Sequence, residues 1–258
     1  MMSAAAELLP LAQQVLWAAW LVFLRVAAIV SVLPAFGERS IPMRVRLSIA
    51  IAFTMIVAPA LSSNATPPPE LTYVVTLGIP EILTGLFFGL LLRFFILILQ
   101  IGGTIAAQST SLSQIFGGSA GADPQPAIGH VLVVSGLALA ALMGLHVQFA
   151  AYILHSYDLV PQGEVVGAAT VRDLGLAAVS RTFELGFVIA APFMIASLLY
   201  NVILGVINRA MPQLMVSFVG APAITAGGLF ILFVSAPIML SVWLDHFSRA
   251  VMSPAGAF

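Results

Sequence analysis

The chain has 258 residues, of which 61% are hydrophobic and only 7% are charged, and its net charge is −1. An ordinary globular domain has about 25% charged and about 45–50% apolar residues, so this composition excludes a cytosolic globular enzyme, a nucleic-acid binder and a disordered scaffold. Together with a mean hydropathy of +1.11, it predicts a polytopic membrane protein, and the lack of cysteine excludes disulfides and cysteine-bound metals.

The first apolar run extends from Leu11 to Phe36, and the first charge in the chain is Glu7. A cleavable signal peptide has a cationic start and a shorter apolar core. The run is long enough to cross a bilayer, which takes about 20 residues. We therefore expect a retained helix that also targets the chain to the membrane.

Six apolar blocks follow one another along the sequence: Leu11–Phe36, Leu47–Leu61, Leu71–Ile101, Ala127–Leu154, Leu174–Ile207 and Leu214–Leu244. Blocks this continuous are typical of helices rather than of barrel strands, which alternate in polarity. The predicted fold is all-α: a polytopic membrane protein of about six hydrophobic helices arranged as kinked hairpins. The second block is short and the third and fifth are long, so we expect some segments that are re-entrant or buried in protein.

Prolines and small residues mark special points in these blocks. Six prolines lie inside or near the block edges, where each removes a helical hydrogen bond and is expected to kink its helix: Pro34, Pro59, Pro80, Pro192, Pro222 and Pro237. Gly85 and Gly89 form a GxxxG motif, and Gly136, Ala140 and Gly144 would share one face of the fourth block. Faces of small residues allow helices to approach closely.

The arginines suggest an orientation in the membrane. The connection between the first two blocks has three of them, and the connection after the fifth block has Arg209. By the positive-inside rule, these two connections would be cytoplasmic and both termini would lie outside. Arg249, near the C-terminus, favours the opposite assignment.

Four charged residues lie inside the apolar blocks or near their ends: Arg25, Glu81, Arg93 and Glu184. A charge at the centre of a membrane helix costs about 2.5–3.5 kcal/mol on insertion scales. Such residues either line an ion path or substrate site, or form salt bridges between helices or subunits. The second interpretation is favoured because the charges are scattered and no acidic cluster accompanies them. Arg181 and Glu184 are three residues apart and can pair on one helix.

Enzymatic chemistry finds no support in the sequence. The four histidines, His130, His146, His155 and His246, lack the spacing of metal ligands. The chain has no HExxH, P-loop or GxGxxG motif. We expect a protein that is not an enzyme and has no metal and no cofactor.

The connection Gln108–Gln125, with the sequence QSTSLSQIFGGSAGADPQ, combines hydroxyl residues, glycines and the bulky pair Ile115–Phe116. One interpretation is a flexible connection whose apolar pair packs against a neighbouring segment. The other is a mobile plug with an apolar tip. The residues alone leave both open.

Three stretches together resemble the FliR family of flagellar biosynthesis proteins, which includes the SpaR and YscT proteins of virulence-type injectisomes. They are LRVAAIVSVLPAFGERSIPMRVRLSIAIA at Leu24–Ala52, AAQSTSLSQIFGGSAGADP after the third block, and GVINRAMPQLMVSFVGAPA at Gly205–Ala223. The resemblance extends almost end to end.

The resemblance implies a structural subunit of the type III protein export gate, in the bacterial inner membrane at the flagellar basal body. Its partners would be FliP and FliQ, with FlhB and FlhA, unfolded flagellar export substrates and inner-membrane lipid, but no nucleic acid. Within a single integral membrane domain, 1–258, residues 1–173 would correspond to FliP-like helices and residues 174–258 to a FliQ-like hairpin. An injectisome subunit of the same family is the alternative.

In this family the central connection lies in the pore as a plug. Carried over to this chain, the plug would consist of Leu112, Ile115, Phe116, Gly117, Gly118, Gly121, Asp123 and Pro124. Bulky apolar side chains can close a pore by filling and dewetting it, and glycines give the backbone freedom to move. Asp123, which precedes a proline, would end the loop.

The resemblance also draws attention to two polar turns, whose residues we expect to serve in subunit assembly or simply in setting topology: Glu38, Arg39, Pro42, Arg44, Arg46, Asn208, Arg209, Pro212 and Gln213. A function of a different class, a stand-alone secondary transporter, would need inverted repeats and a polar site at the membrane midplane. The sequence shows no convincing example of either.

Overall fold

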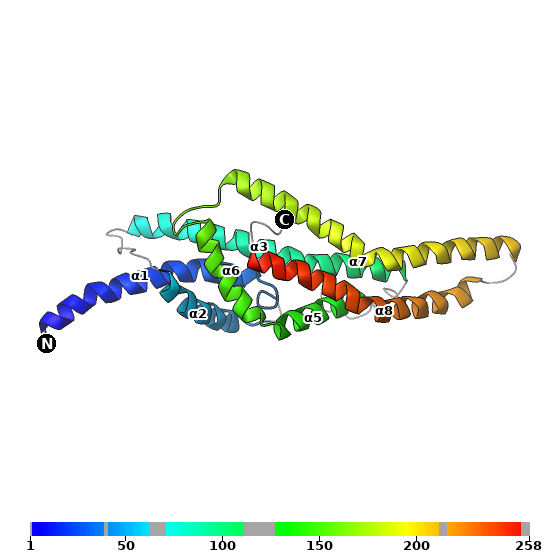
Figure 1. The fold of residues 1–258 in the computed structure, drawn as a ribbon, viewed down its shortest axis with the longest axis horizontal. Coiled ribbons are helices and arrows are strands. Elements are labelled where there is room, and N and C mark those ends of the chain that lie inside the picture. Colours follow the sequence, from blue (N-terminus) through cyan, green and yellow to red (C-terminus); the bar gives the residue numbers. More distant parts are fainter. Residues whose placement is uncertain (1, 39–40, 62–70, 111–126, 212–215, 254–258) are drawn as a thin grey trace. The chain divides into compact units, whose positions relative to one another are not determined.

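The computed structural model describes residues 2–38, 41–61, 71–110, 127–211 and 216–253. Every regular element in these ranges is a helix (Figure 1). The helices are α1 (Met2–Val32), α2 (Met43–Ala60), α3 (Leu71–Ser109), α5 (Ala127–Leu142), α6 (Leu145–Leu159), α7 (Ala168–Ala210) and α8 (Val216–Met252). The all-α prediction is confirmed.

Five of the described helices are long and apolar enough to cross a membrane, and the number rises to six if the bent pair α5–α6 is one span. This agrees with a multi-pass membrane protein. The prolines inside α2, α3, α7 and α8 do not end these helices, whereas Pro34 lies just beyond the end of α1.

The fourth apolar block is not one helix, contrary to the sequence prediction. It is broken after Leu142 into α5 and α6. Gly144, at the start of α6, has a φ of +79°, which glycine adopts without the steric cost that other residues meet. Gly136, Ala140 and Gly144 therefore do not share one helix face, because the helix that would align them ends between the second and the third.

The chain divides into two compact units that interleave along the sequence. Unit 1 comprises residues 1–93, 144–178 and 248–258, and unit 2 comprises residues 94–143 and 179–247. The resemblance divides the chain differently, into FliP-like helices at 1–173 and a FliQ-like hairpin at 174–258. That division stays a prediction.

In unit 1, α1 packs closely against the first half of α3. A Cβ atom on Gly85 would lie 2.5 Å from the backbone oxygen of Arg25, and one on Gly89 would overlap the side chain of Val32. The GxxxG motif thus allows a backbone contact within the chain that larger residues would block. α2 follows α1 as a hairpin, and Phe36 in the turn between them makes edge-to-face contacts with Phe53 and Phe149.

In unit 2, the second half of α3 packs against α5, α7 and α8 through small residues and aromatic rings. A Cβ atom on Gly103 would overlap Gly129 of α5, and Gly102 faces Ile189 of α7. Trp243 of α8 is buried, and its indole N–H donates a hydrogen bond of 2.8 Å to the backbone oxygen of Phe95. No charged side chain takes part in these contacts.

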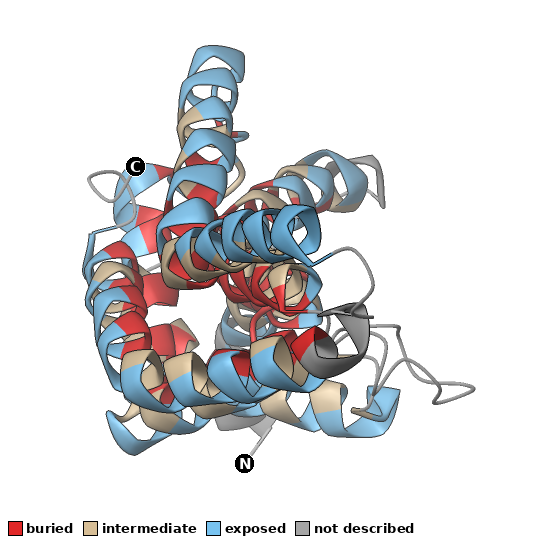
Figure 2. Ribbon diagram, turned by 90° about the vertical axis from the view of Figure 1, so that its right-hand side faces the viewer, coloured by how far each residue is buried: buried red, intermediate tan, exposed pale blue. Residues whose placement is uncertain are grey.

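Much of the helical surface in the described residues is exposed (Figure 2), and many of the exposed side chains are large and apolar. In the most apolar window of α3, 56% of residues are buried, but the corresponding fraction is only 17% for α7 and for α8. The sequence alone would not distinguish these helices, because all three are similarly apolar. The outer faces of α7 and α8 are therefore the surfaces on which lipid or other protein chains can pack.

Candidate functional site: a buried arginine–glutamate centre

Arg25 of α1 and Glu81 of α3 form an ion pair in the interior of unit 1. Both side chains are 0% exposed, and the Arg25 Nε donates to Glu81 Oε2 at 2.7 Å while Nη2 donates to Oε1 at 3.2 Å. Leu21, Val22 and Val26 of α1 are buried around Arg25. The helical periodicity that buries these apolar residues also carries Arg25 into the core.

The guanidinium of Arg25 has all five of its N–H groups in hydrogen bonds. Besides the two to Glu81, Nη1 donates to the backbone oxygens of Ser156 at 3.1 Å and Val160 at 2.8 Å, and Nη2 donates to that of Pro161 at 3.2 Å. These three carbonyls lie at the end of α6 and just after it. No donor of Arg25 is left for another ligand.

The carboxylate of Glu81 is also fully engaged. Its Oε1 accepts from the backbone N–H of Gly163 at 2.6 Å, and Oε2 accepts a long hydrogen bond of 3.4 Å from the hydroxyl of Tyr157. The Tyr157 ring lies against the guanidinium, 3.8 Å from its centroid to the Arg25 Cζ, at cation–π distance. We call Arg25, Glu81 and these partners the Arg25–Glu81 centre.

The chemistry open to the Arg25–Glu81 centre is limited by this saturation. A site that binds an ion or a substrate needs a free donor, a free acceptor or room for water, and here both charges are enclosed and matched. Burying two ions costs several kcal/mol each, which is offset only when geometry and hydrogen bonding are good. The centre therefore favours the salt-bridge interpretation of these two charges over the ion-path interpretation.

Glu38 and Arg93, which the sequence analysis placed in different groups, form a second ion pair in unit 1. The Arg93 Nη1 lies 3.0 Å from Glu38 Oε1, and both side chains are about one-third exposed. Arg46 of α2 donates to the backbone oxygen of Glu38 at 2.5 Å. The turn after α1 is thus tied to α3 and to α2 by arginines.

Glu184, the fourth charge in the apolar blocks, belongs to unit 2 and lies at the surface. Arg181 pairs with it at 3.0 Å on α7, as their spacing suggested. Arg181 Nη2 also lies 3.0 Å from His246 Nε2 of α8. His246 Nδ1 lies 2.9 Å from the backbone oxygen of Val242, so the ring connects Arg181 to the backbone of α8.

The remaining assembly candidates lie apart from the Arg25–Glu81 centre. Within the described ranges, Pro42, Arg44, Asn208 and Arg209 are exposed, and neither Arg44 nor Arg209 has an ion pair. Such free cations on helix ends are available for partners or lipid. Arg39, Pro212, Gln213 and all eight plug residues lie outside the described residues.

Five members of the centre were missed by the sequence analysis. Tyr157 and Gly163 carry a weak signal, since both lie in the polar stretch between two apolar blocks. The carbonyls of Ser156, Val160 and Pro161 carry none, because every residue has a carbonyl. Among the described residues, no group of three or more histidines or acids is placed to hold a metal ion.

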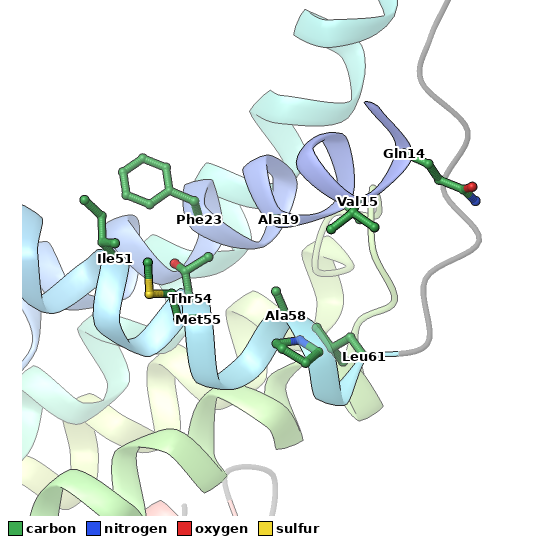
Figure 3. Close-up of a pocket in the computed structure, with 11 residues that line it drawn as sticks. Gln14, Val15, Ala19, Phe23, Ile51, Thr54, Met55, Ala58 and Leu61 are labelled. Atoms are coloured by element: carbon green, nitrogen blue, oxygen red, sulfur yellow. The ribbon is translucent and has the colours of Figure 1, made fainter. Parts of the chain in front are cut away.

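A groove of about 840 Å³ lies between α1 and α2 in unit 1 (Figure 3). Its walls include Val15, Phe23 and Met55, and the hydroxyl of Thr54 is already bonded to the backbone oxygen of Ala50. The eleven lining residues include no ionisable side chain. The groove suits an apolar occupant and offers no group for catalysis.

Comparison with known proteins places this architecture in a family. Residues 16–250 match the model of the bacterial export proteins, family 1. The chain is 34% identical over 240 residues to the flagellar biosynthetic protein FliR of Caulobacter vibrioides, covering 90% of this chain and 93% of that one. It is 27% identical to the FliR proteins of Escherichia coli, over 86% of this chain and 87% of that one, and of Aquifex aeolicus, over 87% of both. The resemblance to FliR is thereby confirmed, and the chain belongs to family 1 of the bacterial export proteins.

Proposed function

We propose that the chain is a structural subunit of the flagellar type III protein export gate in the bacterial inner membrane. The observation that carries this proposal is the nearly end-to-end similarity to proteins named for flagellar biosynthesis, within a family named for export. Unfolded flagellar proteins would cross the membrane through a channel that this chain forms with FliP and FliQ. FlhB and FlhA would be further partners.

The lengths of the helices support an assembly with other chains. α7 has 43 residues, about 64 Å at 1.5 Å per residue, whereas the hydrocarbon core of a bilayer is about 30 Å thick. Even a tilt of about 40° leaves room for only about 39 Å of helix. Large apolar side chains are exposed on α7 from Val171 to Ile207, so lipid alone cannot cover this face, and neighbouring protein helices would cover the rest.

The state of the charges argues against a stand-alone transporter. Arg25, Glu81, Arg93 and Glu184 each have an ion-pair partner within the chain. A substrate site at the membrane midplane would need polar groups that are free to bind. Charges that are paired within the chain are not free to act in catalysis either. We therefore propose that the chain is not an enzyme and that the energy for export comes from outside it.

Within the gate, residues 174–258 would play the FliQ-like part and residues 1–173 the FliP-like part. The segment around Ile115 and Phe116 would plug the pore. Deleting residues 117–121 should make cells leak ions, which a dye sensitive to membrane potential would detect. A deletion variant that is ion-tight and exports normally would contradict the plug.

Native mass spectrometry tests the proposed assembly. The chain is co-expressed with FliP- and FliQ-like subunits and extracted in mild detergent, and we expect one copy in a large hetero-oligomer. A lone monomer or a homodimer would contradict the export-gate proposal and favour the transporter.

Arg209→Glu separates the two roles proposed for the exposed arginines, with Arg172→Glu as the matched control, since Arg172 is exposed but already paired with Asp173. Loss of the partner subunits only with Arg209→Glu supports a role in assembly. Inverted topology in a reporter-fusion assay supports a purely topogenic charge.

A further inference from the structure

The contact between α1 and α3 does not depend on the Arg25–Glu81 ion pair. Gly85 and Gly89 already bring the α3 backbone against the α1 residues Ala28, Ile29 and Val32, and the surroundings are apolar. Two well-packed apolar side chains in place of a buried ion pair are often as stable or more so. We therefore expect a structural role of the two charges that apolar side chains could not fill.

Arg25 donates hydrogen bonds to the backbone at the end of α6. The last carbonyls of a helix have no partner within it, and glycine after the helix or a basic residue in its last turn commonly compensates. α6 has no basic residue in its last turn, and its C-cap residue is Val160 in an extended conformation. Three of the five hydrogen bonds of Arg25 go to carbonyls at this helix end or just after it. The oxygens of Ser156 and Pro161 also accept from the backbone N–H groups of Val160 and Glu164, and the oxygen of Val160 accepts from Arg25.

Glu81 holds the next part of the chain. Its Oε1 accepts from the N–H of Gly163, whose φ is +81°, as a turn with glycine at its third position requires. The hydroxyl of Thr84, three residues further along α3, donates to the backbone oxygen of Glu164 at 3.1 Å. Two side chains of α3 thus form hydrogen bonds with the middle of the connector between α6 and α7, residues 160–167.

We infer that the Arg25–Glu81 centre is a positioning device for this connector: Arg25 ends α6, Glu81 fixes the turn at Gly163, and together they set the place where α7 begins. The ion pair is the means by which α1 and α3 present donors and acceptors to the connector. This inference uses contacts of unit 1 alone and does not rest on the proposed role in export.

Hydrogen–deuterium exchange on the full chain in detergent or nanodiscs tests the inference with Arg25→Lys. Lysine keeps the positive charge beside Glu81 but has three N–H donors instead of five and no planar fork. We expect the amides of residues 160–168 to exchange at least about tenfold faster, while the amides of 26–32 and 85–92 keep their protection. Arg181→Lys, at the exposed pair, serves as the control and should change neither region.

Two outcomes with Arg25→Lys would overturn the inference. Wild-type protection of the connector would mean that charge alone is needed there. Loss of protection throughout α1 and α3 would mean that the pair is needed to join these two helices.

Gly163→Ala tests the same claim from the connector without altering either charge. A Cβ is strained at this φ and would lie 3.0 Å from Leu77, so we expect the same local loss of protection in 160–168. Gly167→Ala is the matched control in the same connector, because its Cβ would make only an ordinary contact, 3.8 Å from the Thr170 hydroxyl. Equal protection in the two glycine variants would contradict the inference.

Discussion

Two arginine–glutamate pairs in this molecule have similar N–O distances and different surroundings. Arg25 and Glu81 lie 2.7 Å apart, are 0% exposed and connect α1 with α3. Arg181 and Glu184 lie 3.0 Å apart on one helix and are 37% and 60% exposed. The distances alone would suggest equal importance.

The surroundings decide what each pair contributes. In an exposed pair, water solvates both charges and weakens their attraction, so such pairs contribute about 0–1 kcal/mol to the free energy of unfolding. In a buried pair, the loss of one partner leaves the other as an uncompensated charge, which costs about 3–5 kcal/mol. Removal of the carboxylate of Glu81 in unit 1 should therefore lower the free energy of unfolding strongly, whereas removal of that of Glu184 in unit 2 should change it little.

Glu81→Ala should have the largest effect. Arg25 would keep its charge without a counterion in a core that water does not reach, and we expect a loss of about 3–5 kcal/mol of unfolding free energy. Reversible unfolding in mixed detergent micelles, followed by circular dichroism, measures it. A loss no greater than that of Glu184→Ala would break the comparison.

Gly85→Ala tests the close contact of α1 and α3, which brings Arg25 to Glu81. The added methyl group would lie 2.5 Å from the Arg25 backbone oxygen and 2.8 Å from Ala28, and overpacking of this kind costs about 1–3 kcal/mol. Gly175→Ala is the matched control, because nothing lies within 4 Å of its added Cβ. It should be neutral, or stabilising by up to about 1 kcal/mol. The same sign for both would contradict the contact.

The sequence predicted a good part of this arrangement. Apolar block length predicted helices, because each backbone group in lipid must be satisfied within its own segment. The cost of buried charge predicted that Arg25 and Glu81 would find partners, and the GxxxG spacing at Gly85 and Gly89 predicted a close helix contact. These inferences depend only on local composition and spacing.

The rest depended on the tertiary structure. The break at Gly144 could not be predicted, because isolated glycines are common inside apolar helices. The pairing of Glu38 with Arg93 joins residues far apart in sequence, and the partners of Arg25 at Ser156, Val160 and Pro161 are backbone atoms with no signature in the sequence.

Trp243→Phe in unit 2 separates burial from charge. The Trp243 side chain is fully buried, like that of Arg25, but neutral, and its hydrogen bond to the Phe95 oxygen is the polar contact that phenylalanine lacks. We expect a loss of about 1 kcal/mol in the same unfolding assay. Trp20→Phe, at a ring that is 36% exposed, should change less. A loss equal to that of Glu81→Ala would mean that burial, not charge, sets the cost.

Glu184→Ala should have the smallest effect, below about 0.5 kcal/mol, because Arg181 remains hydrated and close to His246. The midpoint of thermal unfolding should not move measurably. A large downward shift would show that this pair is buried by a surface absent from the isolated chain.

The most direct test of the central claim is a double-mutant cycle at both pairs, with methionine replacing each charged residue singly and together. We predict that Arg25→Met and Glu81→Met are strongly coupled, by about 2 kcal/mol or more, because the double variant leaves no lone buried charge. At Arg181 and Glu184 the coupling should stay below about 0.5 kcal/mol. Equal coupling at the two pairs would contradict the account.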